Sequence, residues 1–197
     1  MLLFLFIILC YNCFTRFGSG SMSIRIDKFM LEKIKRNIRL KEVKHIGNYF
    51  NDFQNCYAYA LNIDLPMNIN IGDISDAYDP DYGIGDFEKL FIKDCETLDI
   101  NVEKVDAKYE LSEENSWLVA LYGTDYYMRY YTMKSDFHFV KKNYKSKWKS
   151  KFINEKPKYK DALSKKIINP ETALFAIKDD EDNIVKYKYI GTYKLTR

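Results

Sequence analysis

The hydrophobic and polar positions of this 197-residue chain predict helices in its first half and strands in its second. Apolar side chains recur at positions 87, 90, 91, 95 and 98, so residues Phe87–Leu98 are expected to form an amphipathic helix. The Ala- and Leu-rich stretch Asn55–Asn62 predicts a short buried helix with Asp52 as its N-cap. The basic segment Ile26–Val43 predicts a helix or an extended arm across the domain.

From Trp117 onward the pattern predicts strands. Trp117–Tyr122 is a continuous apolar run, which is typical of a central buried strand, and Asn143–Ser146 is expected to form a hairpin turn. The other predicted strands cover Ser135–Val140, Lys147–Ile153, 175–177 and 187–193, and the last two are expected to close the sheet. Helices followed by an antiparallel sheet indicate an α+β fold, and the length fits a single domain over residues 22–197.

The chain begins with an apolar run, Met1–Cys10, which is too short to span a bilayer comfortably and has the length of a signal-peptide core. Small residues follow at Gly18–Ser21, but a positive n-region is missing. The segment also resembles an engineered junction, with Met22 as the native start. The protein is expected to be secreted or extracytoplasmic if this leader, residues 1–21, is native, and cytoplasmic otherwise, with no stable membrane span after its removal.

Composition excludes a disordered or fibrous protein, because 47% of the residues are hydrophobic and only 30% are charged. Residues 73–114 carry 14 acidic side chains and 4 lysines, whereas residues 141–160 carry 9 lysines and 1 glutamate. The basic stretch indicates either a site for an anionic partner or a solvated hairpin face that complements the acidic half. Without a helix-turn-helix, zinc-finger or RNP signature, nucleic acid is not the expected partner. The abundance of Lys, Asn, Ile and Tyr is also typical of an AT-rich genome.

Few residues are available for catalysis. Phosphate-binding loops, the dinucleotide fingerprint and the serine-hydrolase elbow are absent from the sequence. The two histidines, His45 and His138, lack the spacing of a metal site, so neither a metal nor a cofactor is expected. The cysteines are too sparse for a disulfide framework. They are Cys10, Cys13, Cys56 and Cys95, of which Cys95 is expected to be a core residue.

Cys56 and His138 remain as a candidate nucleophile and base. Cys56 lies near the start of the predicted short helix, where unpaired N–H groups and the helix dipole favour a thiolate. Strand alternation places His138 and Asp136 on one face of the sheet and the flanking phenylalanines on the other. A helix cysteine that meets a strand histidine across the helix–sheet interface is the arrangement of papain-type catalysis. The alternative is that Cys56 is a small core residue and His138 a satisfied polar group.

Four segments then carry a resemblance. They are Asn55-Cys-Tyr-Ala-Tyr-Ala-Leu-Asn62, Asp136-Phe-His-Phe-Val140, Trp148 and Asn169-Pro-Glu-Thr-Ala173. In this order they resemble papain-like cysteine hydrolases of the NlpC/P60 type, in a branch of bacterial, phage and toxin-associated proteins. That branch carries an N-C-Y-x-Y-A helix, a D-Y-H-F-Y-R strand, a W-S-H-K-x-G segment and a D-P-x-T-A turn. The similarity spans roughly residues 51–193 and implies N-terminal helices packed on a C-terminal antiparallel sheet.

The resemblance implies roles for individual residues. Cys56 would be the nucleophile and His138 the general base. The backbone N–H of Cys56, with Gln54 or Asn55 nearby, would bind the oxyanion.

The third catalytic position departs from the family pattern. Two residues past Trp148 the branch has a second histidine, whereas this chain has Ser150. A serine would orient the imidazole only weakly, and the alternatives are Asp136 and Asn154. The Lys-Pro-Gly run of the branch is also replaced, by Lys151-Phe-Ile.

Two functions follow from these observations. The first is a thiol-dependent amide-bond hydrolase, a cysteine peptidase or amidase, that acts through a Cys56 acyl-enzyme on a peptide or peptidoglycan-like substrate. The second is a catalytically weak or inactive papain-like scaffold that binds a partner through its basic, Tyr-rich surface. The serine at position 150 motivates the second.

Overall fold

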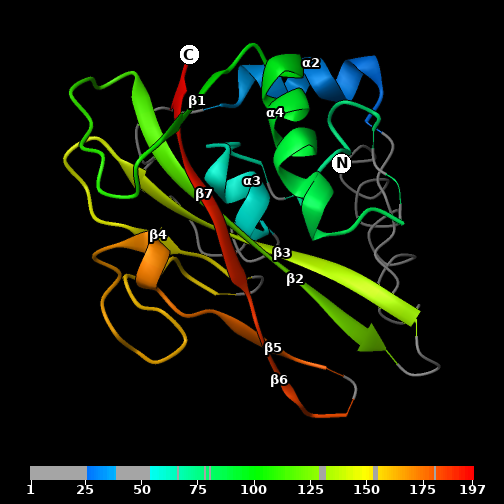
Figure 1. Cartoon of the computed structure of the whole chain (residues 1–197). Coiled ribbons are helices and arrows are strands. Elements are labelled where there is room, and N and C mark those ends of the chain that lie inside the picture. The colour runs from blue at the N-terminus through cyan, green and yellow to red at the C-terminus, as the bar shows by residue number, and fades with distance from the viewer. Residues whose placement is uncertain are drawn as a thin grey trace, which may run out of the picture.

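The fold comes from a computed structural model that describes residues 26–38, 54–65, 67–77, 79, 81–128, 132–152, 155–179 and 181–197. It is an α+β fold in which helices precede an antiparallel sheet, as predicted (Figure 1). The helices are α2 (Lys28–Arg36), α3 (Cys56–Ala60) and α4 (Phe87–Thr97), with single 3-10 turns at η1 (Ile84–Asp86) and η2 (Pro170–Thr172). The strands are β1 (Asn101–Val105), β2 (Ser116–Met128), β3 (Thr132–Asn143), β4 (Lys149–Ser150), β5 (Ala176–Lys178), β6 (Ile184–Lys186) and β7 (Lys188–Thr196).

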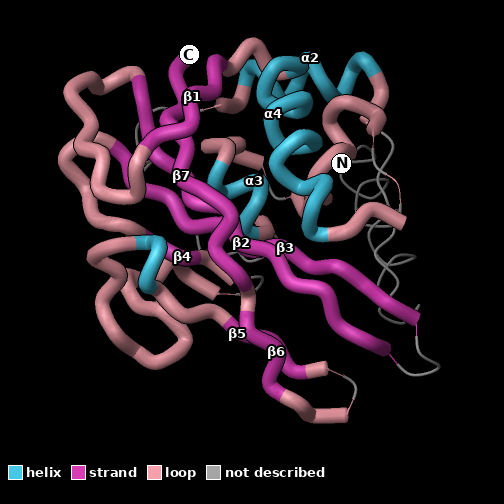
Figure 2. Tube along the Cα trace, in the orientation of Figure 1, coloured by secondary structure: helices cyan, strands magenta, loops and turns pink. Residues whose placement is uncertain are grey.

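The main sheet has the strand order β1-β7-β2-β3-β4, so β2 is its central strand (Figure 2). Residues 117–122 of β2 are at most 1% exposed, which confirms the predicted central buried strand. Two other expectations were wrong. The last strand does not close an edge but lies between β1 and β2, and β5 pairs only with β6, in a separate two-stranded sheet.

Both faces of the main sheet are covered. Trp117, Val119 and Leu121 of β2 belong to the core that includes the helices. The alternate positions Leu118 and Tyr122 belong to a second core beneath the C-terminal segments. Burial on both faces explains why β2 is a continuous apolar run rather than an alternating one.

The five-residue helix α3 begins with a side-chain cap. A helix this short is not stable by itself, so its ends need partners from elsewhere in the fold. The side-chain oxygen of Asn55 accepts a hydrogen bond from the backbone N–H of Ala58 at 3.0 Å, which makes Asn55 the N-cap. The expected cap, Asp52, lies outside the described residues.

The other end of α3 is held by two long side chains of the sheet. Trp117 donates its indole N–H to the carbonyl of Ala60 at 2.8 Å. The ammonium of Lys141 donates to the carbonyl of Tyr59 at 2.9 Å and to Oδ1 of Asn62 at 2.7 Å, and it lies 3.7 Å from the centroid of the Tyr59 ring. Lys141 is buried, so the prediction of a solvated lysine face was wrong at this position.

Asp94 of α4 connects α3 to the loop that follows it. Its buried carboxylate accepts from the Tyr57 hydroxyl at 2.8 Å, the Gly72 N–H at 2.6 Å, and the N–H and hydroxyl of Ser75 at 2.8 and 2.6 Å. Burial raises the pKa of Asp94, although these hydrogen bonds act in the opposite direction.

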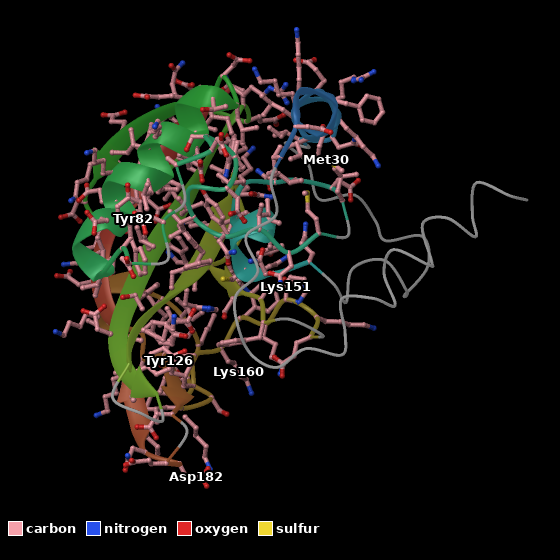
Figure 3. All side chains as sticks on the ribbon, turned by 90° about the vertical axis from the view of Figure 1, so that its right-hand side faces the viewer. Met30, Tyr82, Tyr126, Lys151, Lys160 and Asp182 are labelled. Atoms are coloured by element: carbon pink, nitrogen blue, oxygen red, sulfur yellow. The ribbon has the colours of Figure 1, made fainter. Side chains whose placement is uncertain are left out.

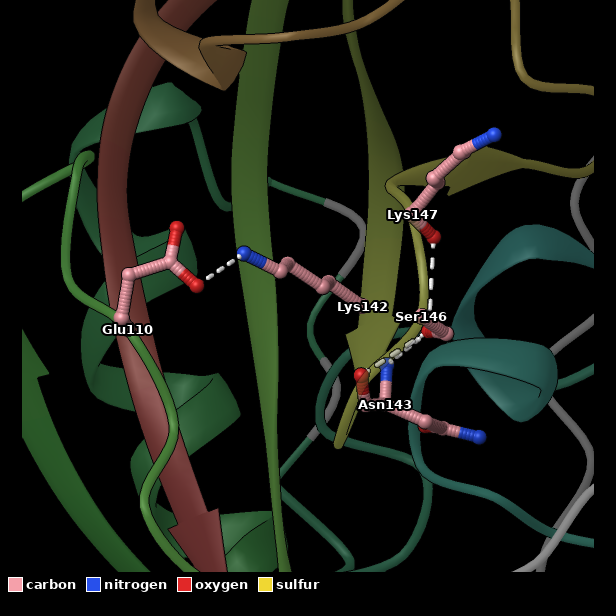
Figure 4. A network of polar contacts seen from close by, with 5 residues as sticks. All are labelled: Glu110, Lys142, Asn143, Ser146 and Lys147. Atoms are coloured by element: carbon pink, nitrogen blue, oxygen red, sulfur yellow. Dashed lines mark hydrogen bonds and ion pairs between the residues drawn. The ribbon is translucent and has the colours of Figure 1, made fainter.

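The turn between β3 and β4 was predicted correctly. The N–H of Ser146 donates to the carbonyl of Asn143 at 3.0 Å, and the Ser146 hydroxyl bonds the same residue (Figure 4). Nearby, Lys142 forms a 2.7 Å ion pair with Glu110, so one lysine of the basic stretch does contact the acidic half.

No helix within the described residues has both the length and the apolar character required to cross a bilayer. The apolar leader and His45 lie outside the described part of the chain.

Replacement of Asp94 by alanine is expected to lower the free energy of unfolding by about 3 kcal/mol, because it leaves several buried donors without their acceptor. Chemical denaturation measures the change. The matched control is Glu110→Ala, which breaks an exposed ion pair and should cost under about 0.5 kcal/mol. Equal effects of the two substitutions would contradict the role given to Asp94.

Candidate active site

Cys56 is the first residue of α3 and is 8% exposed. Its thiol donates a long hydrogen bond, 3.9 Å, to the carbonyl of Phe137 in β3. The backbone N–H of Phe139 also stabilises the charged form of the sulfur. The thiol therefore lies against the β3 backbone beside His138. Strand β4 pairs with β3 only at residues 140 and 141, which leaves this part of the β3 edge to α3.

His138 faces the second core and is 2% exposed. Its Nε2 lies 2.8 Å from the hydroxyl of Ser150 in β4. The imidazole stacks on the ring of Phe152 at 4.4 Å between centroids and contacts Phe175 at 4.6 Å. Ser150 is itself fixed, because its backbone pairs with Val140 on one side and exchanges two hydrogen bonds with Lys158 on the other.

Asp136 shares the face of His138, as strand alternation predicted, but its carboxylate has other partners. It accepts from the hydroxyl of Tyr187 at 2.5 Å and from the backbone N–H of Phe137 at 2.8 Å. Of the two candidates for the orienting residue that the structure describes, Ser150 is hydrogen-bonded to the imidazole and Asp136 is not. Asn154 lies outside the described residues.

Burial sets the protonation states of the pair. It raises the pKa of the Cys56 thiol to about 12, against the opposing effect of the backbone N–H groups of Phe139, Cys56 and Tyr57. It lowers the pKa of the His138 imidazole to about 3. The N–H groups at the start of α3 do favour a thiolate, as predicted, but desolvation outweighs them. In the resting structure both groups are neutral at pH 7.

The approach of the two groups also differs from the expectation. Helix α3 packs on the phenylalanine face of β3, where Tyr57 stacks on Phe139 with ring centroids 5.0 Å apart, whereas the imidazole lies on the other face. Cys56 thus lies at the edge of β3 and His138 on the opposite face from α3, so the two do not face each other across the helix–sheet interface. Both residues are described, and no hydrogen bond joins the thiol to the imidazole. A negative charge on Cys56 would nevertheless raise the pKa of Tyr187, whose ring lies on the same face of β3 as the imidazole.

The side chains expected near the oxyanion have structural partners. The amide N–H of Gln54 donates to the carbonyl of Ile63, and that of Asn55 donates to the carbonyl of Ile69 at 2.6 Å. The side-chain oxygen of Asn55 is the cap of α3. The donor that remains for an oxyanion is the backbone N–H of the nucleophile.

Sequence reasoning missed the aromatic residues around the imidazole, Phe152, Phe175 and Tyr187. Phe175 and Tyr187 come from segments distant in sequence from β3, whereas Phe152 follows β4 directly, and no local pattern indicates that the three rings meet at the imidazole. Among the described residues, no group of three histidine, cysteine or acidic side chains is placed to hold a metal ion.

Comparison with known proteins adds no relative: no family model matches the chain, and no similar curated protein or solved structure was found.

His138 should make the protein sensitive to acid. The unfolded chain binds a proton at this residue below about pH 6.5, whereas the folded chain does not until about pH 3. The wild type should therefore lose up to about 1.4 kcal/mol of stability per pH unit between pH 6.5 and 3, relative to His138→Gln, which cannot titrate. Urea denaturation of both chains at pH 7, 6, 5 and 4 measures the difference. Parallel curves would show that the imidazole is not buried in its neutral form.

Proposed function

We propose that the protein is a thiol-dependent amide-bond hydrolase, with Cys56 as nucleophile and His138 as general base. One observation carries the proposal: the imidazole is hydrogen-bonded to Ser150 while the thiol donates to the carbonyl of Phe137, the residue that precedes the same histidine. A candidate nucleophile on α3, a base on β3 and an orienting group on β4 are thus arranged around one strand, and these are the three groups that nucleophilic catalysis combines. The resemblance to NlpC/P60-type hydrolases supports the same assignment.

In the proposed reaction one imidazole nitrogen serves Ser150 and the other serves the Cys56 thiol. With Nε2 protonated, His138 donates to the Ser150 hydroxyl and holds a lone pair on Nδ1. Nδ1 takes the thiol proton as the sulfur attacks the substrate carbonyl carbon, and the carbonyl oxygen becomes an oxyanion bound by the backbone N–H of Cys56. The intermediate collapses to a thioester, and the leaving amine takes the proton from the imidazole. Water, deprotonated by His138, then hydrolyses the thioester, which releases the acid and restores the thiol.

Burial of the dyad implies that substrate binding has to open the site. Of the described rings that contact the imidazole, Phe152 is the exposed one, at 37%, whereas Tyr122, Phe175 and Tyr187 are buried. Displacement of this ring would admit the substrate and reduce the desolvation that keeps both groups neutral. The substrate class is proposed to be a peptide or a peptidoglycan-like amide, in line with the resemblance.

A specific observation favours a second candidate function. A thiol with a pKa of about 12 next to an imidazole with a pKa of about 3 is also what an inactive scaffold would show. In that case Cys56 is a core residue and the basic surface binds a partner.

Labelling with a peptidyl acyloxymethyl ketone, followed by intact mass, tests the proposal over pH 5 to 9. The probe should modify Cys56 alone, and Cys56→Ser should abolish labelling. His138→Ala is expected to slow it by about 100-fold or more, and Ser150→Ala by about tenfold. A dyad in which His138 takes the proton gives a rate nearly independent of pH over this range, since the imidazole is unprotonated above about pH 3.

Matched controls separate the dyad from unfolding. Cys95→Ala replaces the other cysteine of the described residues, and Ser146→Ala replaces a serine of the neighbouring turn, and both should label like the wild type. The inactive scaffold predicts slow labelling that is insensitive to His138→Ala and rises about tenfold per pH unit, as for an isolated thiol of high pKa. That result would overturn the proposed function.

A further inference from the structure

A short hairpin next to β4, here called the lysine hairpin, covers residues 156–168. Its arms are joined by the hydrogen bond from the Ile167 N–H to the Tyr159 carbonyl at 2.9 Å and by a bridge between Lys160 and Lys166. The carboxylate of Asp161 accepts from the backbone N–H groups of Leu163 and Lys165 and so closes the turn. In Figure 1 this segment is the orange loop at the lower left, away from α2 and α4.

The hairpin exposes one large apolar side chain at its turn and another at its base, and a third follows in the adjoining segment. Leu163 at the turn is 54% exposed, and Ile168 at the end of the second arm is 80% exposed. Leu174, 37% exposed, is joined to the turn by the hydrogen bond from the Ala162 N–H to its carbonyl at 2.8 Å. Exposed aliphatic side chains at the turn and the base of one cationic segment are typical of a surface that lies at a membrane interface.

Exposed lysines surround these apolar groups. They are Lys156, Lys158, Lys160, Lys165 and Lys166. The one acidic side chain of the hairpin, Asp161, is engaged by its own turn, and Glu155 just before the hairpin pairs with Lys158 at 2.9 Å. Figure 3 shows Lys160 in the lower half of the molecule, away from Met30 of α2. The hairpin is therefore strongly positive, with one exposed aliphatic side chain at its turn and another at its base.

The hairpin is held in place by the rest of the fold. The backbone of Lys158 exchanges two hydrogen bonds with Ser150, at 2.7 and 2.8 Å. On the other side, Asp161 accepts from the N–H of Leu174 at 3.2 Å. Because the backbone is fixed at both points, the tip is presented without a large loss of chain entropy on binding.

We propose that the lysine hairpin docks on an anionic lipid surface. Leu163 and Ile168 enter the boundary between headgroups and acyl chains, and the lysines contact the anionic headgroups. Nucleic acid would match the charge, but bases are bound by stacking on aromatic rings and by arginine. The hairpin contains no arginine, and its one aromatic ring, that of Tyr159, is 45% exposed and lies 5.2 Å from the ammonium of Lys149. Transfer of exposed aliphatic side chains from water into lipid is favourable, whereas contact with the phosphates of nucleic acid is not. This inference does not rest on the proposed hydrolase activity.

Vesicle flotation of the full chain tests the proposal, with vesicles of phosphatidylcholine containing 30% phosphatidylserine and of phosphatidylcholine alone. Binding should require phosphatidylserine and weaken between 0.1 and 0.5 M salt. Lys165→Gln with Lys166→Gln is expected to lower the affinity about 20- to 30-fold, and Leu163→Ser with Ile168→Ser at least about tenfold. The control is Ile184→Ser, which removes a 69% exposed aliphatic side chain of β6 and should leave binding unchanged.

All these chains share the apolar segment 1–21, so the differences between variants isolate the hairpin. Equal vesicle binding by the lysine variant and the wild type would overturn the proposal. So would the absence of vesicle binding. If the same lysines were then required for retention of single-stranded DNA, the partner would be nucleic acid. If they were required for self-association, it would be the acidic residues 73–114 of a second copy.

Discussion

The anchoring of α3 is the constraint on which the candidate site depends. A helix of five residues cannot supply its own stability, yet its first residue must be placed to within a fraction of an ångström for its thiol to be useful. Asn55 caps one end, and Trp117 and Lys141 bind the carbonyls at the other. Tyr57 of the helix in turn binds Asp94 of α4. Buried polar contacts from both halves of the chain thus fix the position of Cys56.

Strand β3 is the second feature on which the candidate site depends, because its two faces pack against different cores. One face carries Phe137 and Phe139 into the core beneath α3, and the other carries His138 into the aromatic second core. The shortness of β4 leaves a strand edge at which Cys56 can lie while Ser150 still reaches the imidazole. The same packing desolvates both reactive groups, so the geometry favours catalysis while the resting electrostatics oppose it. Access through the Phe152 ring is the feature that would reconcile them.

The local pattern of hydrophobic and polar residues was sufficient to predict the elements with strong periodicity. The helix over 87–98, the buried strand 117–122, the turn at 143–146 and the opposite orientation of His138 and its neighbouring phenylalanines all follow from spacing and turn chemistry. The buried state of Cys95 was also predicted correctly.

The features that were not predicted from the sequence depend mainly on contacts between segments far apart in the chain. The insertion of β7 between β1 and β2, the separate β5–β6 pair and the ring of aromatic residues around the imidazole are set by the whole fold. The thiolate expectation for Cys56 failed because a helix N-terminus is visible in the sequence whereas desolvation is not. Asp94 was overlooked for a similar reason: an acidic residue within an amphipathic helix gives no sign that four donors converge on it.

The most direct test of the account is the state of the His138 ring, measured by long-range hydrogen–nitrogen correlation NMR between pH 5 and 8 in the wild type and in Ser150→Ala. The account predicts a neutral ring throughout, with the proton on Nε2 in the wild type and a mixture of tautomers once the Ser150 hydroxyl is removed. A protonated imidazolium at pH 7, or a wild-type ring with its proton on Nδ1, would contradict the claim that Ser150 orients a neutral base toward Cys56.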